Sequence, residues 1–245
     1  MRSTRDTYNS RTEEIDLFFH ELEILDSQTN FFQSSGEQAD EHEQRFNDLD
    51  ESSEKHKKNT FFKILKANAV LMIYNLVEST LINGIEEIYS KLQSKKIGYS
   101  NLCDDIQNLW ISNKLGQVFK RNAHFNSFKK RTVEIVNSIM SSKSIELNIN
   151  DLNFAGNLDA DKIRIVCKSH GMQLHPDSSC RGGSVLKDVK GKRNDLAHGT
   201  LSFADCGRAL SLSDLKDIKD QTYAFLKSLL DAMEKYYNCE GYLNS

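Results

Sequence analysis

Proline is nearly absent from this chain. Pro176 is the only proline in 245 residues, and there are only 12 glycines. Sheets joined by many tight turns use both residue types, so their scarcity argues against a β-sandwich or a β-barrel. Apolar residues recur instead at helical spacing along much of the chain. The sequence therefore predicts an all-α protein with few strands.

Metal-binding and nucleotide-binding motifs are also missing. The five cysteines include no CxxC pair, which leaves a disulfide framework or a structural zinc site without support. His170, His175 and Cys180 are loosely spaced and make only a weak zinc candidate. The chain contains no Walker loop, GxSxG elbow or glycine-rich dinucleotide fingerprint. We therefore expect no metal and no other cofactor.

Long apolar runs are missing too. The most apolar stretch, residues 69–77, is far too short to cross a bilayer. It is flanked by Lys66, Asn68 and Glu78, and the N-terminus opens on polar residues, unlike a signal peptide. These features, with the unpaired cysteines, predict a cytoplasmic protein with no membrane partner.

The net charge of −3 conceals an asymmetry. Four arginines and 15 acidic residues give residues 1–54 a net charge of −11, which leaves +8 on residues 55–245. The basic part could accept a polyanion, whereas the acidic part could cover the basic face or simply keep the protein soluble.

Hydrophobic spacing divides the chain into an acidic helical N-terminal extension, residues 1–59, and a helical domain, residues 60–240. Helices are predicted over residues 3–27, 60–92, 102–111, 126–140, 159–170 and 184–198, with a last helix after a capping box at Ser211 and Asp214. Residues 145–154 alternate like a short extended segment. The helix over residues 126–140 would turn five apolar side chains inward: Val133, Ile135, Val136, Ile139 and Met140.

The segment KRNDLAHG, residues 192–199, places Arg193 and His198 at the end of one predicted helix. Arginine is a permanent cation that fits a phosphate, and histidine transfers protons near neutral pH. Asn194 and Asp195 share a side of the helix with His198 and could orient the pair. This combination suits phosphodiester cleavage. Alternatively, Arg193 pairs with an acid on a solvated face and His198 bonds the last helical carbonyls.

Two further features bear on this motif. Glu78, with Asn75 one turn earlier, follows the most apolar part of the long predicted helix, where a carboxylate needs a partner. Glu78 could form a salt bridge with the motif helix, or it could position Arg193 or His198. A second Arg-to-His match, Arg164 with His170, lacks a polar cluster beside its arginine, and we expect it to serve packing and surface charge.

A basic segment, residues 119–131, interleaves cations with three phenylalanines and contains no acid. It could bind RNA by phosphate contacts and base stacking, or it could bury its phenylalanines under a basic surface. The candidate RNA-binding cations of this segment are Lys120, Arg121, Lys129, Lys130 and Arg131. Lys190 and Lys192 add positive charge beside the motif.

The arginine-to-histidine spacing with a polar residue after the arginine resembles the signature of the HEPN superfamily of helical ribonucleases. Three wider segments, residues 68–80, 154–165 and 192–208, resemble the bacterial MAE-type HEPN-like nucleases. This resemblance covers residues 60–238 and identifies residues 60–240 as a HEPN-like nuclease domain.

The resemblance implies an all-α, HEPN-like helical bundle with long antiparallel helices, which forms a homodimer. It also implies a metal-independent endoribonuclease of a bacterial toxin or antiphage defence system, which cleaves single-stranded RNA at the dimer interface. His198 would transfer the proton, Arg193 would stabilise the phosphorane, and Asn194 and Asp195 would orient them. A partner could be an antitoxin or another defence protein. The alternative is a catalytically silent HEPN-like module that binds nucleic acid or protein in a defence complex.

Overall fold

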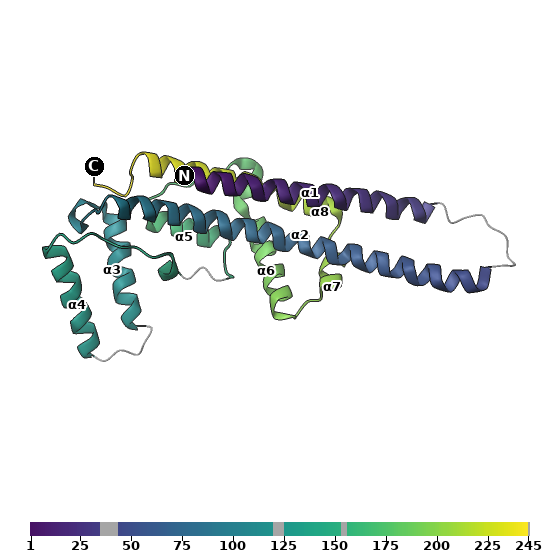
Figure 1. Ribbon diagram of the computed structural model, residues 1–245, viewed down its shortest axis with the longest axis horizontal. Coiled ribbons are helices and arrows are strands. Elements are labelled where there is room, and N and C mark those ends of the chain that lie inside the picture. Colours follow the sequence, from purple (N-terminus) through teal and green to yellow (C-terminus); the bar gives the residue numbers. More distant parts are fainter. Residues whose placement is uncertain (35–43, 120–124, 153–155, 245) are drawn as a thin grey trace.

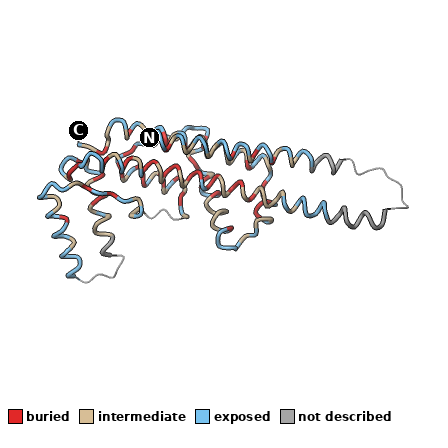
Figure 2. The backbone as a smooth tube through the Cα atoms, in the orientation of Figure 1, coloured by how far each residue is buried: buried red, intermediate tan, exposed pale blue. Residues whose placement is uncertain are grey.

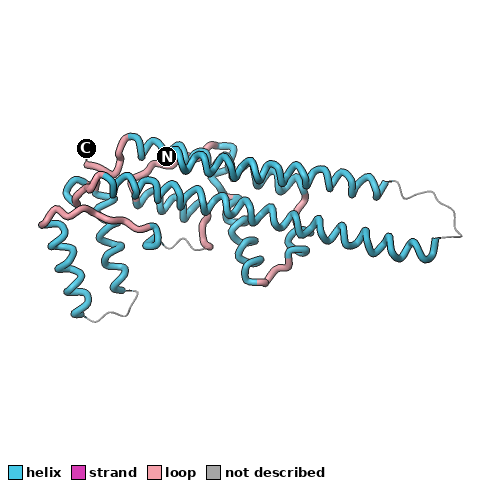
Figure 3. The backbone as a smooth tube through the Cα atoms, in the orientation of Figure 1, coloured by secondary structure: helices cyan, strands magenta, loops and turns pink. Residues whose placement is uncertain are grey.

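The computed structural model describes residues 1–34, 44–119, 125–152 and 156–244. Over these residues the chain consists of helices and loops with no strand (Figure 3), which confirms the predicted all-α class. Its α-helices are α1 (Arg2–Ser34), α2 (Gln44–Ser94), α3 (Asp104–Phe119), α4 (Phe125–Met140), α5 (Ala160–Ser169), α6 (Val185–His198), α7 (Phe203–Arg208) and α8 (Leu212–Asn238). Short 3-10 turns cover Tyr99–Asn101, Ile149–Leu152 and Ser178–Gly183.

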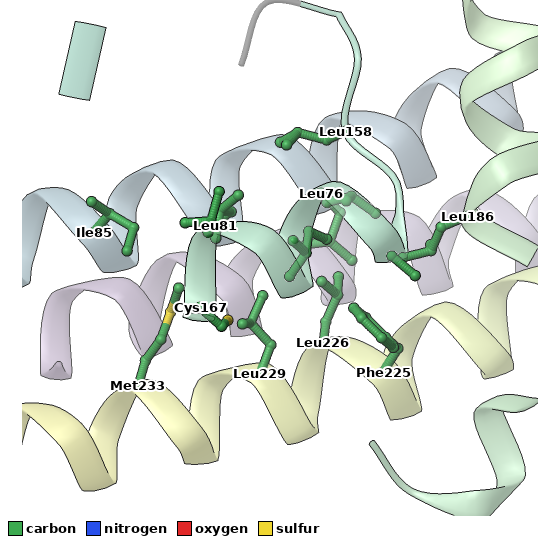
Figure 4. Close-up of a cluster of buried hydrophobic side chains, with 14 of the residues drawn as sticks. Leu76, Leu81, Ile85, Leu158, Cys167, Leu186, Phe225, Leu226, Leu229 and Met233 are labelled. Carbon is green, nitrogen blue, oxygen red and sulfur yellow. The ribbon is translucent and has the colours of Figure 1, made fainter. Parts of the chain in front are cut away.

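Helix α2 forms the centre of the bundle. Helix α1 runs antiparallel along it, and α8 lies beside both (Figure 1). The buried stretches of the chain gather around the middle of α2 (Figure 2). There Leu81 and Ile85 of α2 pack with Leu229 and Met233 of α8 and with Cys167 of α5 (Figure 4). Burial of this apolar stripe is the main force that holds α2 in place.

The acidic N-terminal segment belongs to this core. Ile15, Phe19 and Leu22 of α1 are each no more than 2% exposed. The predicted boundary between residues 59 and 60 lies inside α2, which continues without a break. On the surface, two carboxylates of α1 pair with lysines of α8, in the pairs Asp16–Lys219 and Glu23–Lys216. These two carboxylates therefore pair with Lys216 and Lys219 of α8, and they do not cover Arg193.

One stretch of α2, Glu54–Ser94, is long and apolar enough to cross a membrane by length and composition alone. The central helix of a bundle passes the same test, because it is apolar on several faces. In this chain many apolar side chains of the stretch, among them Val70, Ile73 and Leu81, are buried against other helices, whereas Phe61 near its start is exposed.

Two local predictions have different outcomes. Residues 145–148 are not helical, and Ile145 and Leu147 are buried while Glu146 and Asn148 are exposed, so the predicted alternation is present at the start of the segment. From Ile149 to Leu152 the chain instead forms a 3-10 turn. The prediction for the inward face of α4 is wrong. In α4 only Ile135 is buried. Three of the side chains predicted to face inward are about half exposed or more: Val133, Val136 and Met140.

The short helix α7 fixes the connection between α6 and α8. Cys206 and Gly207 are buried against α2. A Cβ atom on Gly207 would lie 1.8 Å from the carbonyl oxygen of Lys63 in α2. Only glycine permits so close an approach of the two backbones.

Candidate functional site

Helix α6 carries the predicted motif, and its end is set by local sequence. Leu186, Val189 and Leu196 are buried on one side of the helix. Gly199 adopts the left-handed conformation, with φ of 71°, and its N–H bonds the carbonyls of Asp195 and Leu196. This is the usual glycine termination of a helix. The predicted range of 184–198 is confirmed, and His198 is the last residue of α6, where the helix extends away from α2 (Figure 1).

Arg193 is half-buried and lies against α2. Its guanidinium carbon is 5.1 Å from the ring centroid of Tyr74, within the range of a cation–π contact. Nη1 donates to Oδ1 of Asn194 over 3.1 Å. Within the described residues, no carboxylate forms an ion pair with this guanidinium. Arg193 therefore keeps its charge and most of its N–H donors available to a ligand.

Tyr74 is itself fixed by hydrogen bonds. Its hydroxyl donates to Oε1 of Glu78 over 3.1 Å and accepts the N–H of Leu158 over 3.2 Å. Burial raises the pKa of Tyr74 to about 12, so the hydroxyl stays protonated and remains a donor. Oε1 of Glu78 also accepts the N–H of Gly156 over 3.1 Å.

Glu78 forms no salt bridge with the motif helix among the described residues, so that alternative is wrong. Its carboxylate instead bonds Tyr74 and Gly156, which both lie next to Arg193. Asn75 does not join this network. It is exposed, and its backbone carbonyl accepts a long hydrogen bond of 3.5 Å from Arg11.

Gly156, in the loop before α5, lies next to the Arg193 guanidinium. Its φ is +69°, a conformation that glycine adopts readily and side-chain-bearing residues adopt rarely. A Cβ atom at this position would lie 2.7 Å from Nη1 of Arg193. The backbone at Gly156 thus leaves the space that the guanidinium occupies.

His198 is exposed at the tip of α6, and its imidazole forms no hydrogen bond or ion pair with the described residues. The carboxylate of Asp195 accepts a bond of 3.3 Å from the Thr200 hydroxyl, and its carbonyl accepts the Thr200 N–H. Asp195 therefore stabilises the turn after the helix. Of the two predicted orienting residues, Asn194 bonds Arg193, and no side-chain hydrogen bond joins either of them to His198.

The predicted RNA-binding cations fall into two groups. Lys190 forms an ion pair with Asp159, and Lys192 is half-buried. On α4, Lys129 and Lys130 are exposed, whereas Arg131 pairs with Glu134 over 2.8 Å. The phenylalanines beside them, Phe125 and Phe128, are 77% and 39% exposed, which favours the stacking interpretation over burial. Lys120 and Arg121 lie outside the described residues.

Of the second arginine-to-histidine match, His170 lies in the core and Arg164 is partly exposed. His170 is 0% exposed, its Nε2 accepts from the Tyr89 hydroxyl over 2.7 Å, and its Nδ1 bonds the carbonyl of Val166 over 2.7 Å. Because a carbonyl can only accept, Nδ1 carries the proton of the neutral ring. Arg164 bonds the carbonyl of Gly182. Among the described residues no three His, Cys, Asp or Glu side chains are grouped to hold a metal ion.

His170 makes folding stability depend on pH. Burial lowers the pKa of His170 to about 4, against about 6.5 for the unfolded chain, and nearby Asp105 opposes the shift only partly. Between about pH 4 and about pH 6.5, His170 is therefore protonated in the unfolded state and neutral in the folded state. Acidification from pH 7 to pH 5 should remove about 2 kcal/mol of stability through this residue.

Urea unfolding at both pH values tests this expectation. The pH-dependent loss should shrink in His170→Gln and persist in His175→Gln, since His175 is exposed. An equal loss in all three proteins would show that His170 does not titrate in this way.

Sequence reasoning missed Tyr74 and Gly156. Tyr74 precedes Glu78 by four residues on the same face of α2, a spacing that brings the two side chains together. That signal was available in the sequence. The contact of Arg193 with both residues was not, because it joins three separate segments of the chain.

Comparison with known protein families gives one result. The family model described as HEPN_MAE_28990-like HEPN matches residues 6–242, which spans α1 to α8 and includes the acidic N-terminal helix. No curated protein and no solved structure matches the chain.

Proposed function

This chain belongs to the HEPN_MAE_28990-like HEPN family, and on that premise we propose that it is a metal-independent endoribonuclease that cleaves single-stranded RNA. The observation that supports this proposal best is the state of Arg193, which is fixed over Tyr74 without a carboxylate partner among the described residues. A positioned guanidinium with free donors is suited to a phosphate.

In the proposed reaction, His198 removes the proton from a ribose 2′-hydroxyl. The 2′-oxygen then forms a bond to the adjacent phosphorus, and the bond from phosphorus to the 5′-oxygen breaks. The products are a 2′,3′-cyclic phosphate and a 5′-hydroxyl, which takes up a proton as it leaves. Arg193 would donate to the phosphorane oxygens, where negative charge accumulates.

We propose that two copies of the chain build the composite cleft. Residues five apart on a helix point about 140° apart, so Arg193 and His198 of one copy diverge around α6. A second copy related by a twofold axis can bring its own motif to the same phosphate. Lys129 and Lys130, with Phe125 and Phe128, would extend RNA binding along α4.

The biological setting that we propose is a cytoplasmic toxin or antiphage defence system. Uncontrolled RNA cleavage would damage the host cell. An antitoxin or another defence protein would then act as a partner that restrains the nuclease.

One observation favours a second candidate, a catalytically silent module that binds nucleic acid or protein. His198 has no partner among the described residues to fix its tautomer or its orientation, and general bases are usually oriented by a neighbouring group.

The decisive experiment incubates purified protein with end-labelled single-stranded RNA in EDTA. The nuclease proposal predicts fragments that end in a 2′,3′-cyclic phosphate, and these should not react with a ligase that needs a 3′-hydroxyl until the cycle is opened and the phosphate is removed. RNA that is bound but left intact would support the silent module. Loss of cleavage in EDTA that Mg²⁺ restores would contradict the metal-independent mechanism.

A further inference from the structure

We propose that Tyr74 is a positioning residue that holds Arg193 in the orientation in which it meets the RNA phosphate. The proposal rests on the proposed function, since it assigns to Arg193 the contact with the phosphate. It begins with the burial of Tyr74, which is 1% exposed and has its ring face against the guanidinium. A buried ring with both hydrogen-bonding directions of its hydroxyl occupied has little freedom to move.

The contact of Arg193 with an aromatic ring, and not with a carboxylate, affects whether Arg193 can bind an anion. If Glu78 formed an ion pair with Arg193, the carboxylate would neutralise the cation and occupy two of its donors. Instead, Oε1 of Glu78 is bonded to the Tyr74 hydroxyl and to the Gly156 N–H. The aromatic face attracts the guanidinium without using its N–H groups. Tyr74 therefore fixes the position of Arg193 and leaves it free to bind an anion.

Gly156 lies beside the same guanidinium. A Cβ atom on residue 156 would lie 2.7 Å from Nη1, too close for the guanidinium to keep its present position. The same residue donates its N–H to Glu78. The loop before α5 and the Tyr74–Glu78 pair of α2 thus together contact the Arg193 side chain of α6.

The first test measures position directly, without reference to activity. An Arg193 guanidinium over the Tyr74 ring should give an upfield-shifted Nε–H resonance in a ¹⁵N-correlated NMR spectrum, assigned by its loss in Arg193→Lys. Tyr74→Leu should return the shift toward the value of a free arginine, whereas Tyr74→Phe should keep much of it because the ring remains. An unshifted resonance in the wild-type protein would overturn the proposal.

The second test is kinetic. Tyr74→Leu should reduce kcat for RNA cleavage about 10- to 100-fold, because a small displacement of a catalytic group can cost that much. KM should change less, and Tyr74→Phe should restore most of kcat. Wild-type kcat in a folded Tyr74→Leu protein would overturn the proposal. If the wild-type protein cleaves no RNA, the proposed function fails, while the NMR shift still decides whether Tyr74 holds Arg193.

A third variant covers the case in which Tyr74→Leu does not fold. Gly156→Ala leaves Tyr74 intact and adds a Cβ atom 2.7 Å from Nη1 of Arg193, so it should displace the guanidinium, lower kcat and move the Arg193 resonance. Gly171→Ala is the matched control: residue 171 has φ of +74°, and its added Cβ would lie 2.7 Å from Asp105 instead of Arg193. Equal losses of kcat in the two variants would mean that backbone strain, and not the position of the Arg193 guanidinium, causes the loss.

Discussion

His198→Ala should reduce the rate of RNA cleavage about 10²- to 10⁴-fold, the typical contribution of a general acid or base. The imidazole is exposed at the end of α6, so its removal creates no cavity and should leave folding intact. The loss should therefore appear in kcat at an unchanged melting temperature. Gel-based cleavage kinetics with labelled RNA, alongside thermal unfolding, measure both quantities.

Two further variants sharpen the interpretation of His198→Ala. His175→Ala removes another exposed histidine outside the motif and should leave the rate unchanged. Combining His198→Ala with Arg193→Ala should cost little more than either change alone, because residues that act as one catalytic unit are not additive. A His198→Ala protein that cleaves RNA at the wild-type rate would remove this residue from the mechanism.

Gly207→Val should destabilise the fold by about 3 kcal/mol or more, at the upper end of the range for overpacked sites. Even the Cβ atom would lie 1.8 Å from the Lys63 carbonyl oxygen, and backbone cannot be displaced as a flexible side chain can. Helix α7 would have to leave α2. Because α7 follows the turn after His198, activity should fall together with stability. Chemical denaturation of the folded variant gives the free-energy difference.

The control for this substitution lies on the motif helix itself. A Cβ atom on Gly191 meets nothing within 4 Å. Gly191→Ala should therefore stabilise α6 by about 0.5–1 kcal/mol, because alanine has a lower entropy cost in a helix. If Gly207→Val were as stable as the wild-type protein, the close packing of α7 on α2 would not hold the fold as described.

Features with short-range causes could be predicted from the sequence. The left-handed Gly199 ends α6 at His198, and Ser211 with Asp214 forms the capping box that begins α8. The side chain of Asp159 accepts the N–H of Lys162 and caps α5 at the start of the predicted helix. Each of these signals involves residues within one or two turns of one another, so the sequence specifies them before any tertiary contact forms.

The outcome for α4 shows why other features were mispredicted. The spacing of its apolar residues is helical, and the helix exists. Which of those residues become buried depends on what packs against them, and α4 contacts mainly α3 and the turn at Tyr99–Asn101. Val136 and Met140 therefore stay exposed although their pattern is typical of an inward face.

By itself, the sequence determined the all-α class, the ends of the motif helix and the place of Arg193 and His198 on it. Only the tertiary structure decided what surrounds Arg193. Tyr74, Gly156 and Arg193 come from α2, from the loop before α5 and from α6, and their contacts depend on how these segments pack. Local conformational preferences act over a few residues. A binding site, in contrast, forms where burial of a common core brings distant segments together.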